Sequence, residues 1–123
     1  MKSGTLLHRQ VHPGFIQNGK ISSQAFRPTP KDENKLSVYN GDMITAEKAY
    51  YHFCKQLNYS SAGVMSVTQA ECASQSLPIG EDKIPFPEHC HINFEGLAKS
   101  QIEKKAKFLK NYAESRGWQF RPE

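Results

Sequence analysis

Two histidines, His89 and His91, stand two positions apart in a segment whose polar and apolar residues alternate. Alternation predicts a strand, so both imidazoles should lie on one face, about 6.5–7 Å apart. Two imidazoles at that separation could share a metal ion if a third donor joined them. The candidate third donors are Asp82, Glu88, His8 and His52. The alternative is that both histidines face solvent or make structural hydrogen bonds.

Cys90 lies between these histidines and suggests a thiol beside a base. Neighbouring side chains of a strand point to opposite faces, so neither imidazole is expected to reach the thiol. The pair His52 and Cys54 fails similarly, because positions two apart on a helix do not face each other. The chain has three cysteines and no CxxC pair. This pattern predicts free thiols in a reducing, cytoplasmic setting rather than disulfides or a structural zinc site.

A third set consists of Arg9, Ser22-Ser23 and Glu71, each in a segment predicted to be a strand. Their order resembles the Arg…Ser-x-Ser…Glu pattern of ADP-ribosyltransferases, although the two serines are adjacent here. Gln69, two positions before Glu71, agrees with one variant of that family's last motif. The resemblance implies that Arg9 and Ser23 would contact NAD and that Glu71 would be the catalytic acid. The alternative is a buried Arg9–Glu71 ion pair or simple surface polarity.

A proline-rich segment, residues 24–32, follows the serines and contains Arg27 and Lys31. It could form the rim of a pocket in which Arg27, Lys31 and Ser22 bind an anionic ligand. It could equally be a rigid strand edge with an extended exit.

The net charge of +4 belongs to the C-terminal segment. Residues 97–123 carry seven Lys or Arg and three Glu, whereas residues 1–96 carry nine basic and nine acidic side chains. A basic helix there could meet a phosphate backbone or an acidic protein. Lysines also keep a solvated helix face soluble. We favour the solvated face over a nucleic-acid role.

Turn and periodicity signals predict the elements that position these residues. Asn18-Gly19 predicts a type I′ hairpin with Ile16 opposite Ile21 and a second strand continuing to Phe26. Other strands are predicted at residues 6–11, 36–39, 63–72 and 89–94, and helices at 46–57, ending at Asn58, and at about 96–115. Residues 73–88, rich in proline, predict an irregular connection.

This order predicts one α+β domain over residues 1–123, with a mixed or mainly antiparallel sheet of about five strands and two helices packed on one face. No apolar run is long enough to cross a bilayer, and no segment has the pattern of a secretory signal. Walker, GxGxxG and GxSxG motifs are missing from the sequence.

The sequence therefore favours a small soluble binding module that engages a protein or an anionic ligand, with its cofactor and its oligomeric state left open. Aromatic residues are candidate anchors for a partner, namely Tyr39, Tyr59, Trp118 and Phe120. The alternative is a small NAD-dependent ADP-ribosyltransferase-like enzyme that uses Arg9, Ser23 and Glu71.

Overall fold

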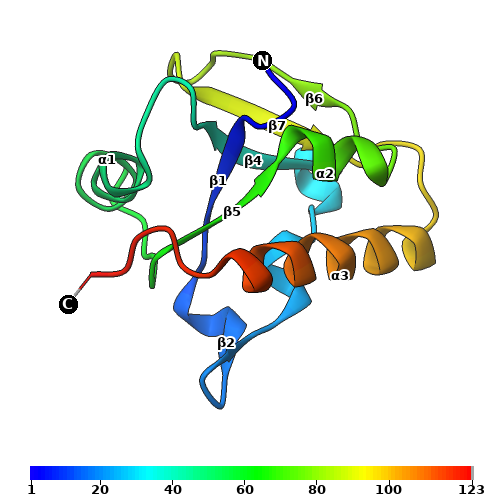
Figure 1. The fold of residues 1–123 in the computed structure, drawn as a ribbon, viewed down its shortest axis with the longest axis horizontal. Coiled ribbons are helices and arrows are strands. Elements are labelled where there is room, and N and C mark those ends of the chain that lie inside the picture. Colours follow the sequence, from blue (N-terminus) through cyan, green and yellow to red (C-terminus); the bar gives the residue numbers. More distant parts are fainter. Residues whose placement is uncertain (123) are drawn as a thin grey trace.

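The computed structural model describes residues 1–122, which form a five-stranded sheet, a separate hairpin and three α-helices (Figure 1). The strands are β1 (Leu6–Gln10), β2 (Ile16–Gln17), β3 (Lys20–Ile21), β4 (Lys35–Asn40), β5 (Val64–Thr68), β6 (Ile79–Gly80) and β7 (His89–Asn93). The helices are α1 (Ala46–Tyr51), α2 (Gln69–Ser74) and α3 (Lys99–Arg116). Short 3₁₀ turns cover Pro13–Phe15, Ser23–Phe26 and Pro30–Asp32, and a π-helical turn, His52–Gln56, extends α1.

The five-stranded sheet has the order β5-β1-β4-β7-β6, and all four of its ladders are antiparallel. The α+β class and the five-stranded, mainly antiparallel sheet are thereby confirmed. None of the described helices is long and apolar enough to span a bilayer.

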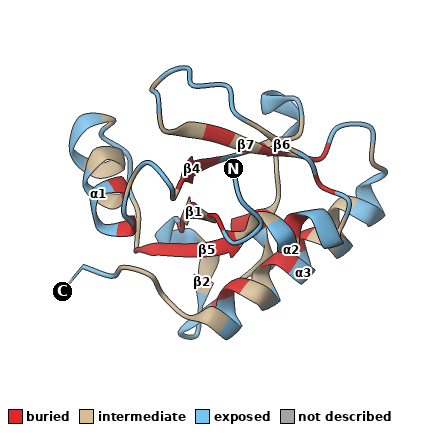
Figure 2. Ribbon diagram, turned by 45° about the horizontal axis from the view of Figure 1, so that its top comes forward, coloured by how far each residue is buried: buried red, intermediate tan, exposed pale blue. Residues whose placement is uncertain are grey.

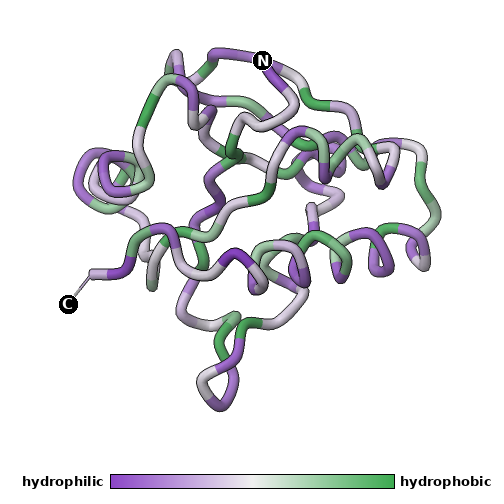
Figure 3. Tube along the Cα trace, viewed as in Figure 1, coloured by the Kyte–Doolittle hydropathy of each residue, from purple (hydrophilic) through white to green (hydrophobic). Residues whose placement is uncertain are grey.

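One face of the sheet forms the main hydrophobic core with α2 and α3. Alternate residues of the strands and the inner face of α3 supply it, including Leu7, Val38, Met65, Val67, Ile92, Ala106, Leu109 and Ala113. Figure 3 shows apolar and polar residues interleaved along α3, as a helix with a single buried face requires. The prediction that the helices at 46–57 and about 96–115 share one face is wrong: α3 lies on this face, but its companion there is α2, and α1 lies on the other face.

The other face of the sheet is polar and meets α1. Tyr39 follows the core residue Val38 in β4, so it points to this second face, where its hydroxyl bonds His52 just after α1. Buried polar side chains on this face include His8 and Ser66, whose Nδ1 and Oγ are 2.7 Å apart. Figure 2 shows α1 separated from α2 and α3 by strands of the sheet.

The predicted hairpin is confirmed in its turn and register. Asn18 and Gly19 have φ angles of 54° and 78°, and Ile16 lies opposite Ile21. The prediction that the second strand continues to Phe26 is wrong. The hydroxyl of Ser22 accepts a hydrogen bond from the Gln24 amide and starts the 3₁₀ turn Ser23–Phe26 instead.

The predicted strand over residues 63–72 is also too long. It ends at Thr68, where a capping box begins α2: the Thr68 hydroxyl accepts from the Glu71 amide, and the Glu71 carboxylate accepts from the Thr68 amide. Glu71 therefore lies on a helix and not on a strand.

One helix ends at an asparagine and the other ends just before a glycine, as predicted. Asn58, with a φ of 60°, ends the turn that extends α1, and Gly117, with a φ of 88°, follows α3. Within the predicted irregular connection, residues 79–80 add β6 to the edge of the sheet beside β7.

Candidate functional site

Strands β1 and β4 are paired at one end only, and the site begins where they separate. Leu7 lies opposite Asn40 and His8 opposite Tyr39, and the ladder then stops. Continued pairing would have placed Gln10 opposite Ser37.

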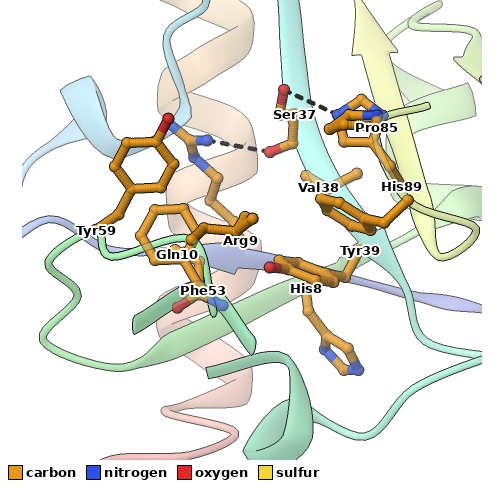
Figure 4. Close-up of a pocket in the computed structure, with 12 residues that line it drawn as sticks. His8, Arg9, Gln10, Ser37, Val38, Tyr39, Phe53, Tyr59, Pro85 and His89 are labelled. Carbon is orange, nitrogen blue, oxygen red and sulfur yellow. Dashed lines mark hydrogen bonds between the residues drawn. The ribbon is translucent and has the colours of Figure 1, made fainter. Parts of the chain in front are cut away.

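The side chain of Arg9 occupies the gap between the separated strands (Figure 4). Its Nε donates to the carbonyl of Ala25 at 2.8 Å, and its Nη1 donates to the carbonyl of Ser37 at 3.0 Å. Burial lowers the pKa of Arg9 to about 10, with Asp32 acting in the opposite direction. The guanidinium therefore remains a cation at neutral pH and links β1 to β4 through the Ser37 carbonyl.

A cavity of about 190 Å³ opens over this gap. Residues 8–10 and 37–39 line it from the two strands, and the other lining residues are Phe53, Leu57, Tyr59, Pro85, Phe86 and His89. An apolar cavity of about 150 Å³ holds one benzene molecule. The site therefore has room for a single ring or a short chain.

Gln10 is the most unusual residue of the cavity lining. It is 6% exposed, and in residues 1–122 neither Nε2 nor Oε1 of its amide has a hydrogen-bond partner. A buried polar group left unpaired costs about 1–3 kcal/mol. A group of this kind calls for a partner, and a ligand that completes both hydrogen bonds is one candidate.

Aromatic side chains form a large part of the cavity wall. The Tyr39 hydroxyl lies 2.8 Å from Nδ1 of His52, and the Phe86 ring stacks on Tyr39 with centroids 5.0 Å apart. Burial, followed by the charge of Glu88, raises the pKa of Tyr39, so the phenol stays neutral. Tyr39 is 4% exposed, so the prediction that it is a surface anchor is wrong; Tyr59, at 61%, is exposed.

A hydrogen-bonded chain of three side chains borders the same cavity. Asp82 Oδ1 lies 2.5 Å from Nδ1 of His89, and Nε2 of His89 lies 3.1 Å from the Ser37 hydroxyl. The second oxygen, Oδ2, lies 3.0 Å from Nδ1 of His91. Burial raises the pKa of Asp82, but the two imidazoles outweigh burial and lower it overall, so the carboxylate is ionised.

His89 and His91 thus share a face, and both direct Nδ1 to one carboxylate. Within residues 1–122, no three or more His, Cys, Asp or Glu side chains are grouped so as to hold a metal ion. The metal role of the two histidines stays a prediction. Cys90 is fully buried among the core residues, and burial raises the pKa of its thiol to about 12, so it stays protonated.

The three residues of the ADP-ribosyltransferase hypothesis have separate partners. Ser23 lies in a 3₁₀ turn, where its hydroxyl accepts from Arg27 at 3.5 Å. Glu71 makes a bidentate pair with Arg116, at 3.0 and 2.8 Å. Of the three, Arg9 alone lines the cavity. The alternative Arg9–Glu71 ion pair does not form either, because both groups are engaged elsewhere.

The residues predicted to bind an anion are also dispersed. Ser22 caps a turn, and Arg27 lies in a groove beside α3, 3.9 Å from Glu103. Lys31 borders a different, shallow hollow together with Asp82 and His91. The structure does not bring these three residues together into one site.

Sequence reasoning missed Gln10 and Ser37 altogether. The available signal was the alternation of polar residues with core residues in two predicted strands. That signal shows which face they share, but it does not show that the strands separate between them.

No protein-family model matches this chain, and comparison with curated proteins and with solved structures gave no match. The geometry of the cavity is therefore the basis for assigning a function.

Proposed function

We propose that this chain is a binding domain for a compact, single-ring ligand that carries a hydrogen-bond donor beside an acceptor, and that the cavity over the β1–β4 gap is its site. The observation that carries the proposal is the amide of Gln10, buried in the cavity lining with both of its polar atoms unpaired in the described chain. A primary carboxamide on the ligand would satisfy both atoms at once.

The shape and chemistry of the cavity narrow the ligand further. Its volume of about 190 Å³ admits one six-membered ring, and Phe53, Tyr59 and Phe86 offer aromatic surface against which such a ring can stack. Arg9 also lines the cavity and adds a fixed positive charge, which would favour a ring with an acceptor atom on that side. The anionic ligand expected from the sequence stays a prediction, because the same charge would attract an anion.

Titration calorimetry and thermal shift with benzamide, benzoate and toluene would test the proposal. We expect benzamide to bind best, because it offers both a donor and an acceptor, and we expect Gln10→Met to weaken its binding at least tenfold, about 1.4 kcal/mol. Gln101→Met on the exposed face of α3 is the matched control and should bind as the unaltered protein does.

Two results would count against the proposal. Benzamide binding that survives Gln10→Met would place the ligand elsewhere, and a failure of all three ring compounds to bind would remove the single-ring class. Binding of NAD without binding of benzamide would show that the ligand is larger than a single ring and would also overturn the proposal.

A further inference from the structure

We infer that Ser37, His89 and Asp82 form a nucleophile, base and carboxylate that hydrolyse a small ester held in this cavity. The inference rests on the proposed function, because the ester must occupy the same cavity. It goes beyond binding by assigning a reaction to residues that line or border the site.

The hydrogen bonds have the directions that acyl transfer needs. Asp82 accepts from Nδ1 of His89 at 2.5 Å, which leaves Nε2, 3.1 Å from the Ser37 hydroxyl, free to accept its proton. Ser37 and His89 both line the cavity, and Ser37 is exposed. A nucleophile with an oriented base at the wall of a ligand cavity is the arrangement expected of a hydrolase.

The β4–β7 ladder holds this chain of residues in place. Ser37 lies opposite His91, and His89 lies opposite Tyr39, so Ser37 and His89 are diagonal neighbours on one face. His91 binds the second oxygen of Asp82 and so fixes the plane of the carboxylate. Asp82 is therefore a positioning residue that acts through His89.

Arg9 on the facing strand lines the same cavity as Ser37 and His89, and its guanidinium remains a cation at neutral pH. A positive charge held in place before the reaction stabilises the negative charge that develops on a tetrahedral intermediate.

The reaction balances without any further reactant except water. The Ser37 oxygen bonds to the ester carbonyl carbon while its proton passes to Nε2 of His89. The bond to the leaving alcohol then breaks, and the alcohol takes that proton. Water attacks the acyl-serine, its proton passes through Nε2 to the Ser37 oxygen, and a carboxylic acid leaves. The cavity volume limits the acyl group or the alcohol to a single ring or a short chain.

Two measurements test the inference: hydrolysis of p-nitrophenyl acetate, and mass-spectrometric mapping of the adduct formed with a fluorophosphonate probe. We expect the adduct on Ser37, and we expect Ser37→Ala and His89→Ala each to lower kcat/KM at least 100-fold. Ser23→Ala is the matched control and should be fully active. Asp82→Asn should lower kcat with little change in KM, because Asp82 orients His89 and does not touch substrate.

The two proposals fail in different ways. A protein that binds benzamide but gives no adduct at Ser37, or that hydrolyses the ester equally well as Ser37→Ala, overturns the hydrolase inference and leaves the binding proposal standing. A protein that does not bind benzamide overturns the proposed function, whatever the result with the probe.

Discussion

Arg9 and Gln10 are neighbours in β1, but within the described residues the Arg9 side chain is hydrogen-bonded and the Gln10 side chain is not. Arg9 places a full charge in the gap between strands and gives two of its donors to carbonyl oxygens. Gln10 buries an amide and pairs neither end of it within residues 1–122. The first arrangement stabilises the fold, and the second weakens it. Substitutions at the two positions should therefore change stability in opposite directions.

Arg9→Met should lower the free energy of unfolding by about 2–4 kcal/mol, because the carbonyls of Ala25 and Ser37 lose a charged donor. Arg27→Met is the matched control. Its contacts with Ser23 and Glu103 are long, at 3.5 and 3.9 Å, so it should cost less than about 1 kcal/mol. Urea unfolding measures both variants, and equal losses would show that Arg9 does not bridge the strands.

Gln10→Met should raise the free energy of unfolding by about 1 kcal/mol, because it removes an unpaired buried amide while nearly keeping its shape. The same variant should lose affinity for benzamide. Urea unfolding without ligand gives the first quantity. If Gln10→Met is instead less stable without ligand, the Gln10 amide is hydrogen-bonded in solution and is not free to bind a ligand.

At the scale of elements, the capping box of α2 has a second role, since its Glu71 also binds Arg116 at the end of α3. Burial raises the pKa of Glu71, but the hydrogen bonds from Arg116 and Thr68 outweigh burial and lower it overall. A carboxylate whose pKa is lowered on folding adds stability above its unfolded pKa, near 4.3 for Glu, and loses it as the pH falls through the folded value.

Glu71→Gln isolates the ion pair, because glutamine can still complete the capping box. We expect it to lower stability by about 1 kcal/mol at pH 7, and we expect this difference to shrink below about pH 4 as the carboxylate takes up a proton. Unfolding curves recorded from pH 3 to pH 7 supply the comparison. A difference that stays constant across that range would mean that the charge of Glu71 is not what binds Arg116.

What the sequence could predict at this scale depends on how local the signal is. The Asn18-Gly19 hairpin and the left-handed end at Asn58 rest on neighbouring residues and are confirmed. The predicted strand through Ser22 extends the hairpin, and the predicted strand through Glu71 rests on β-branched residues and length. In both places a side chain caps the backbone and begins a helical turn. A side-chain cap acts within about three residues, whereas a periodic pattern can be recognised only over a longer stretch. A pattern of strand residues therefore does not reveal the cap that ends it.

The candidate site was less predictable than the fold for a different reason. His89, His91 and Asp82 were named as metal donors, and the structure brings them together around one carboxylate. Ser37 and Gln10 belong to the candidate site only because β1 and β4 separate after a two-residue ladder. In the gap Arg9 reaches carbonyls of two distant segments, and no local pattern in the sequence encodes such a contact.

At the scale of the whole molecule, the C-terminal segment ties the two faces of the sheet together. After α3 it passes β5 toward α1 (Figure 1), and the Val64 amide donates to the Phe120 carbonyl at 2.8 Å. The Phe120 ring then lies 5.2 Å from Tyr50 and 5.7 Å from Tyr51, centroid to centroid. A helix of six residues is too short to be stable alone, so α1 depends on such contacts.

Phe120→Ala should therefore loosen α1 while leaving α3 in place, because the ring contacts are lost and the backbone bridge to Val64 can remain. We expect faster amide hydrogen exchange in residues 46–57, unchanged exchange in α3, and weaker benzamide binding, because Phe53 of the cavity wall follows α1 directly. Arg121→Ala is the control, since that side chain stacks on Trp118 at 4.4 Å and not on α1. Equal exchange in both variants would show that α1 is held by the sheet alone, and that the cavity does not depend on the C-terminal segment.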